Sequence, residues 1–274
     1  MTNQSLTGQS LAGQSLTGKL ALVTGAGNAT GRAIATEFAR QGAAVVLHES
    51  ADSLTLVNAL ATTDAIIAEG GCAATVTGDL AQVADCLRIV DEAAAFLGGL
   101  DILVNHAEIA EAMPLLDVSP ARFDQVLNTN MRGSFFVAQQ AARWMEKRAG
   151  GSIINIGSVA AFAGIPNHSL YAATKGAIAG FTRQLAVELI PNGIRVNAIA
   201  PGYISGEDPT APSPAQNDWG VVGKAEDIGR MVAFLVSPAA TFMNGQVLYL
   251  DGGLTSRLAI YPPLVNTQEL GQQQ

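Results

Sequence analysis

Short apolar runs and longer amphipathic stretches alternate along the chain from Leu20 to Leu250. Apolar runs of about four to eight residues bounded by turn residues are typical of buried strands, and apolar residues at every third or fourth position are typical of helices. The pattern predicts seven strands, at residues 20–24, 43–48, 73–77, 100–105, 151–156, 194–199 and 247–250. It predicts helices at residues 32–40, 52–69, 82–97, 120–148, 169–190 and 225–236.

The regular alternation of strands and helices indicates an α/β domain built on a parallel sheet. Crossovers between parallel strands are right-handed, so helices cover both faces of such a sheet. Ligands of these domains bind at the carboxyl ends of the strands. Asp79 and the segment His106-Ala-Glu108 follow the third and fourth predicted strands, so we expect them at that edge.

The predicted domain occupies residues 19–255, and the two ends of the chain differ from it in composition. The predicted leader is residues 1–18, and a five-residue unit repeats three times between Ser5 and Lys19, which is too little for a solenoid. The Gly, Ser, Thr and Gln content of this segment favours a flexible low-complexity leader over a partner-binding arm. The C-terminal extension, residues 256–274, contains Tyr261-Pro-Pro and a glutamine-rich tail. It is either an arm packed across a subunit interface or a disordered end.

Charge and composition exclude several classes of protein. The 15 basic and 23 acidic residues give a net charge of -8, which disfavours binding to nucleic acid or to an anionic membrane. Because we find neither a secretory signal nor a run of 18 apolar residues, we expect a cytoplasmic protein without a membrane partner. Cys72 and Cys86 have no histidine at ligand spacing, so we interpret both as core residues and expect no disulfide and no metal site.

The stretch Gly25-Ala-Gly-Asn-Ala-Thr-Gly31 follows the first predicted strand and precedes the first predicted helix. In this arrangement backbone N–H groups and the helix N-terminus face a bound anion. A glycine-rich turn alone is often only a turn. Here the strand at residues 43–48 completes a βαβ unit, with the turn where a dinucleotide would bind.

Tyr171 and Lys175 are four residues apart, so in a helix that begins near Ser169 they lie on the same face. A nearby ammonium favours the phenolate and lowers the pKa of Tyr171, which suits the phenol to acid–base work. Ser158 follows a buried strand that could aim its hydroxyl at the same place. The alternative is an ordinary pair on a helix surface, and the rest of the chain must decide between the two.

The motifs together resemble the classical short-chain dehydrogenase/reductase family, across residues 19–255. The resemblance implies a single Rossmann-type domain with a seven-stranded parallel sheet flanked by helices on both faces. It also implies an NAD(P) cofactor and a homo-oligomer, a tetramer or a dimer. The residues that carry it are Thr24-Gly25-x-x-x-Ala29-x-Gly31, Asp79-Leu80, Asn105-x-Ala107, Asn130-x-x-Gly133, Ser158, Tyr171-x-x-x-Lys175 and Pro201-Gly202.

The resemblance implies catalytic roles for four residues. Tyr171 corresponds to the general acid/base, and Lys175 to the residue that lowers the pKa of Tyr171 and binds the nicotinamide ribose. Ser158 would orient the substrate oxygen. Asn130 corresponds to the residue that holds a water in a proton relay through Lys175, although its spacing alone indicates only a polar helix residue.

The resemblance also implies a set of cofactor contacts at the carboxyl edge of the sheet. Asp79 and the backbone around Leu80 would contact adenine, although Asp79 could instead only cap its loop. Asn105 would stabilise the central sheet beside the cofactor. The full set is Gly25, Asn28, Ala29, Thr30, Gly31, Glu49, Asp79, Leu80, Asn105, Ala107, Tyr171, Lys175, Pro201, Gly202 and Ile204.

The chain departs from the family pattern at a few positions of this edge. Ala29 replaces the second glycine of the turn, and His106 replaces the Asn before Ala107. Glu108 replaces the glycine that closes the same signature. This carboxylate is either a solvent-facing loop residue or points into the substrate cleft.

Glu49 directly follows the second predicted strand, about 20 residues past the glycine turn, where an acidic residue accepts hydrogen bonds from the adenine ribose. A 2′-phosphate would bring further negative charge to this carboxylate, and Arg32 is the only basic residue expected nearby. We therefore expect NAD as the cofactor in preference to NADP. The alternative is that Glu49 is a solvated loop charge.

These observations predict an NAD(P)-dependent oxidoreductase that transfers a hydride between nicotinamide and a small-molecule secondary alcohol or ketone. The competing hypothesis is a cofactor-binding or regulatory protein with little turnover, suggested by Ala29, Glu108 and Gly206. The residues between 204 and 222 would decide the substrate, with Trp219, Phe162 and His168 as candidate walls of its pocket.

Overall fold

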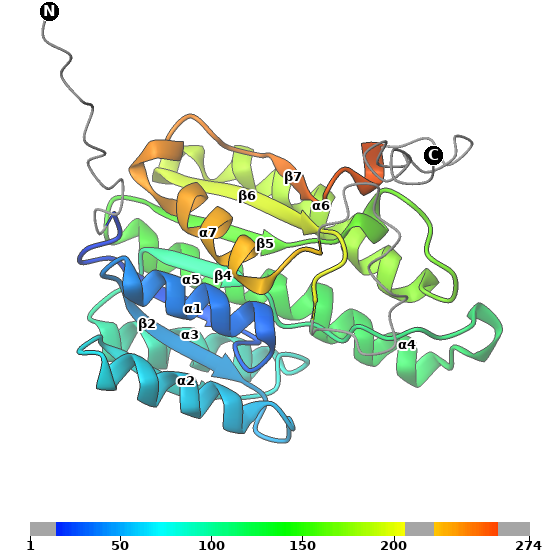
Figure 1. The fold of residues 1–274 in the computed structure, drawn as a ribbon, viewed down its shortest axis with the longest axis horizontal. Coiled ribbons are helices and arrows are strands. Elements are labelled where there is room, and N and C mark those ends of the chain that lie inside the picture. The colour runs from blue at the N-terminus through cyan, green and yellow to red at the C-terminus, as the bar shows by residue number, and fades with distance from the viewer. Residues whose placement is uncertain (1–14, 206–221, 257–274) are drawn as a thin grey trace, which may run out of the picture.

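The computed structural model describes residues 15–205 and 222–256 of the protein (Figure 1). Its sheet has seven parallel strands in the order β3-β2-β1-β4-β5-β6-β7. This arrangement confirms the predicted fold class. The strands are β1 (Leu20–Thr24), β2 (Ala44–Glu49), β3 (Ala73–Thr77), β4 (Ile102–Asn105), β5 (Gly151–Ile156), β6 (Ile194–Pro201) and β7 (Val247–Leu250).

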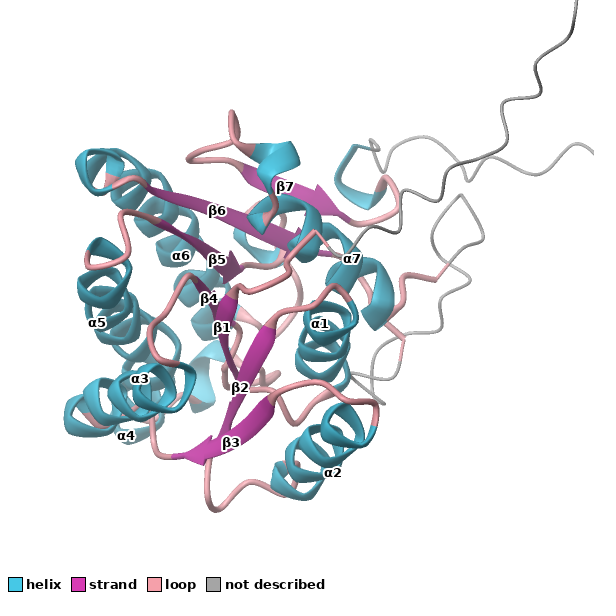
Figure 2. Cartoon of the chain, turned by 90° about the vertical axis from the view of Figure 1, so that its left-hand side faces the viewer, coloured by secondary structure: helices cyan, strands magenta, loops and turns pink. Residues whose placement is uncertain are grey.

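Helices cover both faces of the sheet, as the two sides of Figure 2 show. One face carries α1 (Ala29–Arg40), α2 (Leu56–Ala68) and α7 (Ala225–Val236). The other carries α3 (Val83–Leu97), α4 (Pro120–Leu127), α5 (Ser134–Glu146) and α6 (Ser169–Glu188). None of the helices in the described part of the chain is long and apolar enough to cross a membrane.

The strands are rich in apolar residues because successive side chains point to opposite faces and both faces are covered. In β1, Ala21 and Val23 lie in the core beneath α1 and α7, whereas Leu22 lies in the core beneath α3 and α5. Ile102 and Leu103 of β4 divide between the two cores in the same way. Because every strand pair is parallel, the carboxyl ends of the strands lie at one edge of the sheet.

The prediction of one continuous helix at residues 120–148 is wrong, because the structure has two α-helices in this segment. Pro120 starts α4, and the Ser119 hydroxyl caps it by accepting the Arg122 N–H at 3.2 Å. A π-helical turn, Asn128–Gly133, then separates α4 from α5. Such turns are frequent at functional sites, and this one carries Asn130. Its side chain bonds to the loop after β4, a contact between distant segments that no local pattern predicts.

Two other predictions change at the surface of the domain. Cys86 is buried, as expected, but Cys72 is exposed just before β3, so its assignment to the core is wrong. Within the predicted leader, Leu16 is 0% exposed and its N–H donates to the Gln41 carbonyl at 3.1 Å. Packing on the domain therefore begins before residue 19. The C-terminal extension lies outside the described residues apart from Ser256.

Candidate active site

The turn between β1 and α1 lies tightly against the loop that follows β4. Gly25 has a φ of +64°, and a Cβ at this position would lie 2.6 Å from Ala107 Cα. Only glycine adopts this conformation at so close an approach without strain. The Asn28 side chain caps α1 by accepting the Gly31 N–H at 2.8 Å. The first turn of α1 also holds Ala29 and Thr30, so the predicted phosphate-binding residues share one helix N-terminus.

The loop after β4 is bonded to this turn through two side chains. The Thr24 hydroxyl accepts the N–H groups of His106 and Ala107 at 3.0 and 3.1 Å. The His106 ring lies 3.1 Å from the Gly25 carbonyl through Nδ1 and 3.4 Å from the Asn28 amide through Nε2. His106 thereby joins both segments. The sequence marked this residue only as a departure from a motif, since nothing in its neighbours along the chain indicates these partners.

Glu49 is buried at the end of β2 and is held by three donors. Its Oε2 accepts the Gly27 N–H at 2.9 Å and the Thr55 hydroxyl at 3.1 Å, and its Oε1 accepts the Ser50 N–H at 2.9 Å. The interpretation of Glu49 as a solvated loop charge is therefore wrong. The three hydrogen bonds fix the position of the carboxylate at the end of β2.

A cleft of about 360 Å³ opens between the glycine turn and the ends of β2, β3 and β4. Its described lining carries three carboxylates, Glu49, Asp79 and Glu108, and neither lysine nor arginine. Asp79 caps its own loop by accepting the Ala81 N–H at 2.9 Å, which agrees with the capping alternative and leaves the residue at the cleft. Gly25, Asn28, Leu80 and Ala107 also line it, so seven of the predicted cofactor and cleft residues meet here. The glycine turn and the helix N-terminus beside it fit the phosphates of a dinucleotide.

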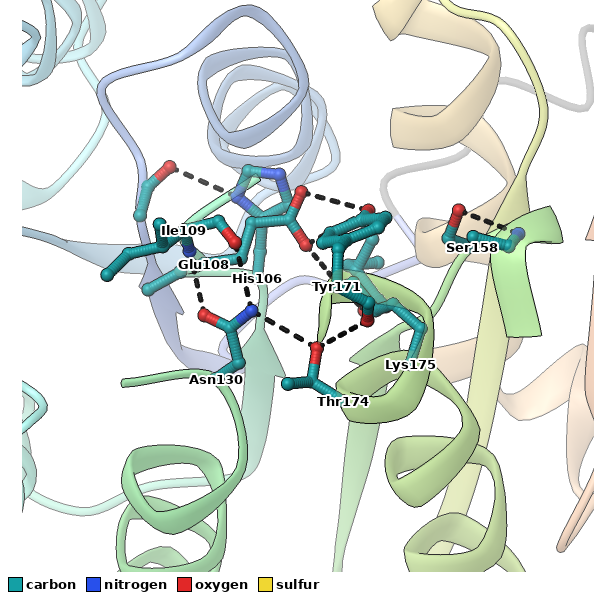
Figure 3. Close-up of polar contacts among 12 residues, drawn as sticks. His106, Glu108, Ile109, Asn130, Ser158, Tyr171, Thr174 and Lys175 are labelled. Atoms are coloured by element: carbon teal, nitrogen blue, oxygen red, sulfur yellow. Dashed lines mark hydrogen bonds and ion pairs between the residues drawn. The ribbon is translucent and has the colours of Figure 1, made fainter. Parts of the chain in front are cut away.

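The predicted acid–base pair lies beside this cleft, on the first turns of α6 (Figure 3). Lys175 is 3% exposed, and its Nζ donates to the Ile156 carbonyl at 2.7 Å. The ammonium also forms an ion pair with Glu108. The Tyr171 hydroxyl lies 3.4 and 3.5 Å from the two carboxylate oxygens of Glu108. A buried ammonium with these partners is not an ordinary helix-surface charge, so the surface-pair alternative is wrong.

Asn130 is buried and ties three segments together (Figure 3). Its side chain accepts the Ile109 N–H at 2.7 Å and donates to the Ile109 carbonyl at 3.1 Å. It also donates to the Thr174 hydroxyl at 3.2 Å, which connects it to α6. Asn130 therefore fixes the loop that carries Glu108 against the helix that carries Tyr171. Thr174 was not singled out from the sequence, because its partner is distant along the chain.

Ser158 and the remaining predicted residues lie around this cluster. The Ser158 hydroxyl accepts the Ala160 N–H at 3.1 Å, and Figure 3 shows Ser158 apart from the contacts of Tyr171 and Glu108. Asn105 is buried and donates to the Asn155 side chain at 3.0 Å, between β4 and β5.

The remaining predicted cofactor contacts come from the end of β6 and the segment after it. Pro201 ends β6, a Cβ on Gly202 would lie 2.8 Å from Asp251 Cα, and Ile204 is buried beside Gly223. Gly206 and Trp219 lie outside the described residues.

The fold and this edge define a class of protein, the dinucleotide-binding α/β oxidoreductases. The family model described as enoyl-(acyl carrier protein) reductase matches residues 25–255. The chain therefore belongs to the classical short-chain dehydrogenase/reductase family, a family of oxidoreductases that act on small molecules.

Relatives of known sequence support this membership. The chain is 40% identical over 258 residues to a hydroxynaphthalene reductase-like protein Arp2 from Metarhizium acridum. The aligned region covers 86% of this chain and 94% of the relative. It is 34% identical over 251 residues to an uncharacterised oxidoreductase from Thermotoga maritima. The aligned region covers 87% of this chain and 98% of that relative.

Solved structures agree with the fold. A short-chain dehydrogenase from Burkholderia cenocepacia in complex with NADP superposes with a TM-score of 0.81 at 36% identity, covering 89% of this chain and 100% of that chain. A 7α-hydroxysteroid dehydrogenase in complex with NADH and 7-oxo glycochenodeoxycholic acid superposes with a TM-score of 0.82 at 34% identity, covering 88% and 96%.

Proposed function

We propose that this protein transfers a hydride between NAD(H) and a secondary alcohol or ketone, with Tyr171 as the general acid/base. The observation that carries the proposal is the buried Lys175 ammonium on the same face of α6 as the Tyr171 phenol, at the carboxyl edge of the sheet beside the cleft. A phenol near a fixed ammonium can exchange a proton near neutral pH.

Four residues of the chain have separate roles around the reacting oxygen of the substrate. Tyr171 gives its proton to the carbonyl oxygen in reduction and takes it back in oxidation. Lys175 stabilises the phenolate, and Ser158 orients the oxygen through its hydroxyl. Asn130 takes part in the proton relay and keeps the loop and α6 in register. When bound, NAD supplies the nicotinamide that gives or takes the hydride.

Glu49 supports the preference for NAD over NADP. The carboxylate is fixed by three donors at the end of β2, so it cannot swing away easily from a 2′-phosphate. One charge pair near 4 Å costs about 4 kcal/mol at an effective dielectric of 20. Solvent screening reduces this to about 2 kcal/mol, which corresponds to roughly thirtyfold in affinity.

The cofactor preference is tested by comparing kcat/KM with NADH and NADPH in the wild type and in Glu49→Gln. The wild type should prefer NADH by about thirtyfold, and the variant should lose most of that ratio because the repelling charge is gone. Asp64→Asn, which removes an exposed charge on α2, is the matched control and should keep the wild-type ratio. Equal use of both cofactors by the wild type, or an unchanged ratio in Glu49→Gln, would sink the assignment.

A cofactor-binding protein with little turnover is the alternative function. It is distinguished from an enzyme by titrating NADH and then following its oxidation with a panel of ketones. The relatives named above guide the panel toward cyclic substrates, a bicyclic aromatic ketone and a steroid ketone, with small aliphatic ketones for comparison. Binding of NADH without turnover of any ketone would favour the alternative.

The proposal includes a cytoplasmic homo-oligomer, a tetramer or a dimer. Phe123 and Phe135, on α4 and α5, are 49% and 41% exposed, and apolar side chains of this size commonly mark contacts between subunits. Light scattering on the full chain measures the mass, and a monomer would contradict this part of the proposal.

A further inference from the structure

Glu108 brings a carboxylate into the acid–base site. Its oxygens contact both members of the predicted pair, as an ion pair with Lys175 Nζ and at 3.4 and 3.5 Å from the Tyr171 hydroxyl (Figure 3). The Lys175 side chain is 4% exposed and that of Glu108 is 21% exposed, so solvent screens the three groups only partly. The carboxylate also lines the cleft assigned to the cofactor.

The backbone on both sides of Glu108 is fixed. On one side, the Thr24 hydroxyl holds the N–H groups of His106 and Ala107. On the other side, the Asn130 side chain holds both the N–H and the carbonyl of Ile109. The position of the carboxylate therefore follows from the packing of the loop against β1 and the π-helical turn, rather than from a freely moving surface residue.

A carboxylate in this position opposes the effect of Lys175 on Tyr171. It disfavours the phenolate through charge, and as an acceptor it favours the protonated hydroxyl. Its ion pair also reduces the net positive charge that the phenol experiences. The distances of 3.4 and 3.5 Å are long for hydrogen bonds between oxygens, so charge carries most of the effect, and it decreases only with the inverse of distance.

Other charged and titratable groups near Tyr171 have partners of their own. The His168 ring is centred 6.1 Å from the Tyr171 ring, and its Nδ1 lies 2.7 Å from the Pro166 carbonyl. Glu111, on the same loop as Glu108, pairs with Arg122 of α4. His106 contacts the glycine turn through both of its ring nitrogens. Glu108, in contrast, contacts both Tyr171 and Lys175.

We propose that Glu108 is a positioning residue of the acid–base set, holding Tyr171 in its protonated, hydrogen-donating form so that the site is set for carbonyl reduction at neutral and mildly alkaline pH. This inference rests on the proposed function. It adds that the chain favours the reductive direction through a carboxylate where the family pattern has glycine.

The first test follows the ionisation of Tyr171 and needs no turnover. The near-ultraviolet absorbance of phenolate is titrated in the wild type, Glu108→Gln and Glu111→Gln, and the signal of Tyr171→Phe is subtracted. In Glu108→Gln the Tyr171 phenolate should form at a pH lower by about one unit or more, because the opposing charge is gone. Glu111→Gln, which removes a carboxylate from the same loop, should titrate as the wild type does.

The second test is kinetic. In Glu108→Gln, kcat/KM for ketone reduction should begin to fall at a pH about one unit lower than in the wild type, while alcohol oxidation near neutral pH should accelerate. Glu108→Gly removes the same carboxylate and should shift both profiles in the same direction, and it replaces the glutamine variant if that variant does not fold. Glu108→Asp keeps a carboxylate and should restore at least part of the wild-type profile.

Several outcomes would overturn the inference. These are an unchanged or upward-shifted Tyr171 titration in Glu108→Gln and Glu108→Gly, or an equal shift in Glu111→Gln. Failure of the proposed function is a separate result, because a wild type that reduces no ketone still gives the phenolate titration, which then decides the role of Glu108 alone.

Discussion

At the scale of single residues, two neighbouring side chains at the end of β2 differ in their hydrogen bonding. Glu49 accepts three hydrogen bonds from N–H and O–H donors. His48 is buried, its Nε2 lies 3.1 Å from the Gly78 carbonyl, and its Nδ1 has no partner among the described residues. Burial lowers the pKa of His48, because the charged imidazolium would lose its hydration. The folded chain therefore keeps His48 neutral.

This environment predicts an acid-sensitive contribution to stability. The pKa of His48 is lower in the folded state than the unfolded value of about 6.5, so the unfolded chain takes up the proton first as the pH falls. The contribution is intact above pH 6.5 and decreases below it, by up to about 1.4 kcal/mol per pH unit. His48→Gln keeps a donor for Gly78 and does not titrate. Denaturant unfolding between about pH 7 and pH 5 should show a shallower loss in the variant, and parallel curves would contradict this account.

Whether the place of a residue could be predicted from the sequence depends on how far away along the chain its contacts lie. Tyr171, Lys175 and Glu49 could be predicted because helix spacing and strand ends fix their places locally. The partners of His106 and Glu108 could not, since they depend on how the loop after β4 lies against β1 and α6. The sequence left two orientations open for Glu108, and the structure favours the one that faces the site.

At the scale of elements, the β1–α1 turn and the loop after β4 act as one unit. Gly25 permits their close approach, while the hydroxyl of Thr24 and the ring of His106 supply the hydrogen bonds between them. The strands and most helices could be predicted within a few residues from their hydrophobic periodicity. The π-helical turn could not, because its Asn130 is held by partners on two distant elements.

Gly25→Ala tests this unit. The new Cβ would lie 2.6 Å from Ala107 Cα, so the loop must shift, and the φ of +64° adds about 1–2 kcal/mol of strain. We expect a lower melting temperature and a loss of NADH affinity of about tenfold or more. Gly18→Ala is the matched control, because it has a φ of +71° with nothing within 4 Å of its Cβ. It should lose stability only, and unaltered NADH binding in Gly25→Ala would argue against the unit.

At the scale of the whole molecule, the domain closes around two cores on either side of the sheet. The core beneath α1 and α7 includes Leu16, which comes from the segment before β1. Composition alone assigned this residue to a flexible leader, because the five-residue repeat gives no sign that its last leucine is buried. The contact with α1 and Gln41 depends on the assembled fold and is not encoded in local composition.

Leu16→Ala should therefore destabilise the whole domain. Removing a fully buried leucine side chain costs about 2–5 kcal/mol, depending on how far the cavity collapses. The change is measured as a shift of the denaturant midpoint with an unchanged slope. Leu54→Ala, at a side chain that is 96% exposed, is the control and should change stability by less than about 0.5 kcal/mol. Equal, small effects of both substitutions would show that Leu16 contributes nothing to the core.

The central claim, acid–base catalysis of hydride transfer by Tyr171, is tested most directly by Tyr171→Phe. The substitution removes one hydroxyl and keeps the ring, so kcat for ketone reduction should fall by about 10² to 10⁴-fold. NADH affinity, titrated on the same preparation, should stay within about a factor of three, which corresponds to less than 1 kcal/mol. A variant that binds NADH normally and retains more than about a tenth of the wild-type kcat would contradict the assignment of Tyr171 as the proton donor.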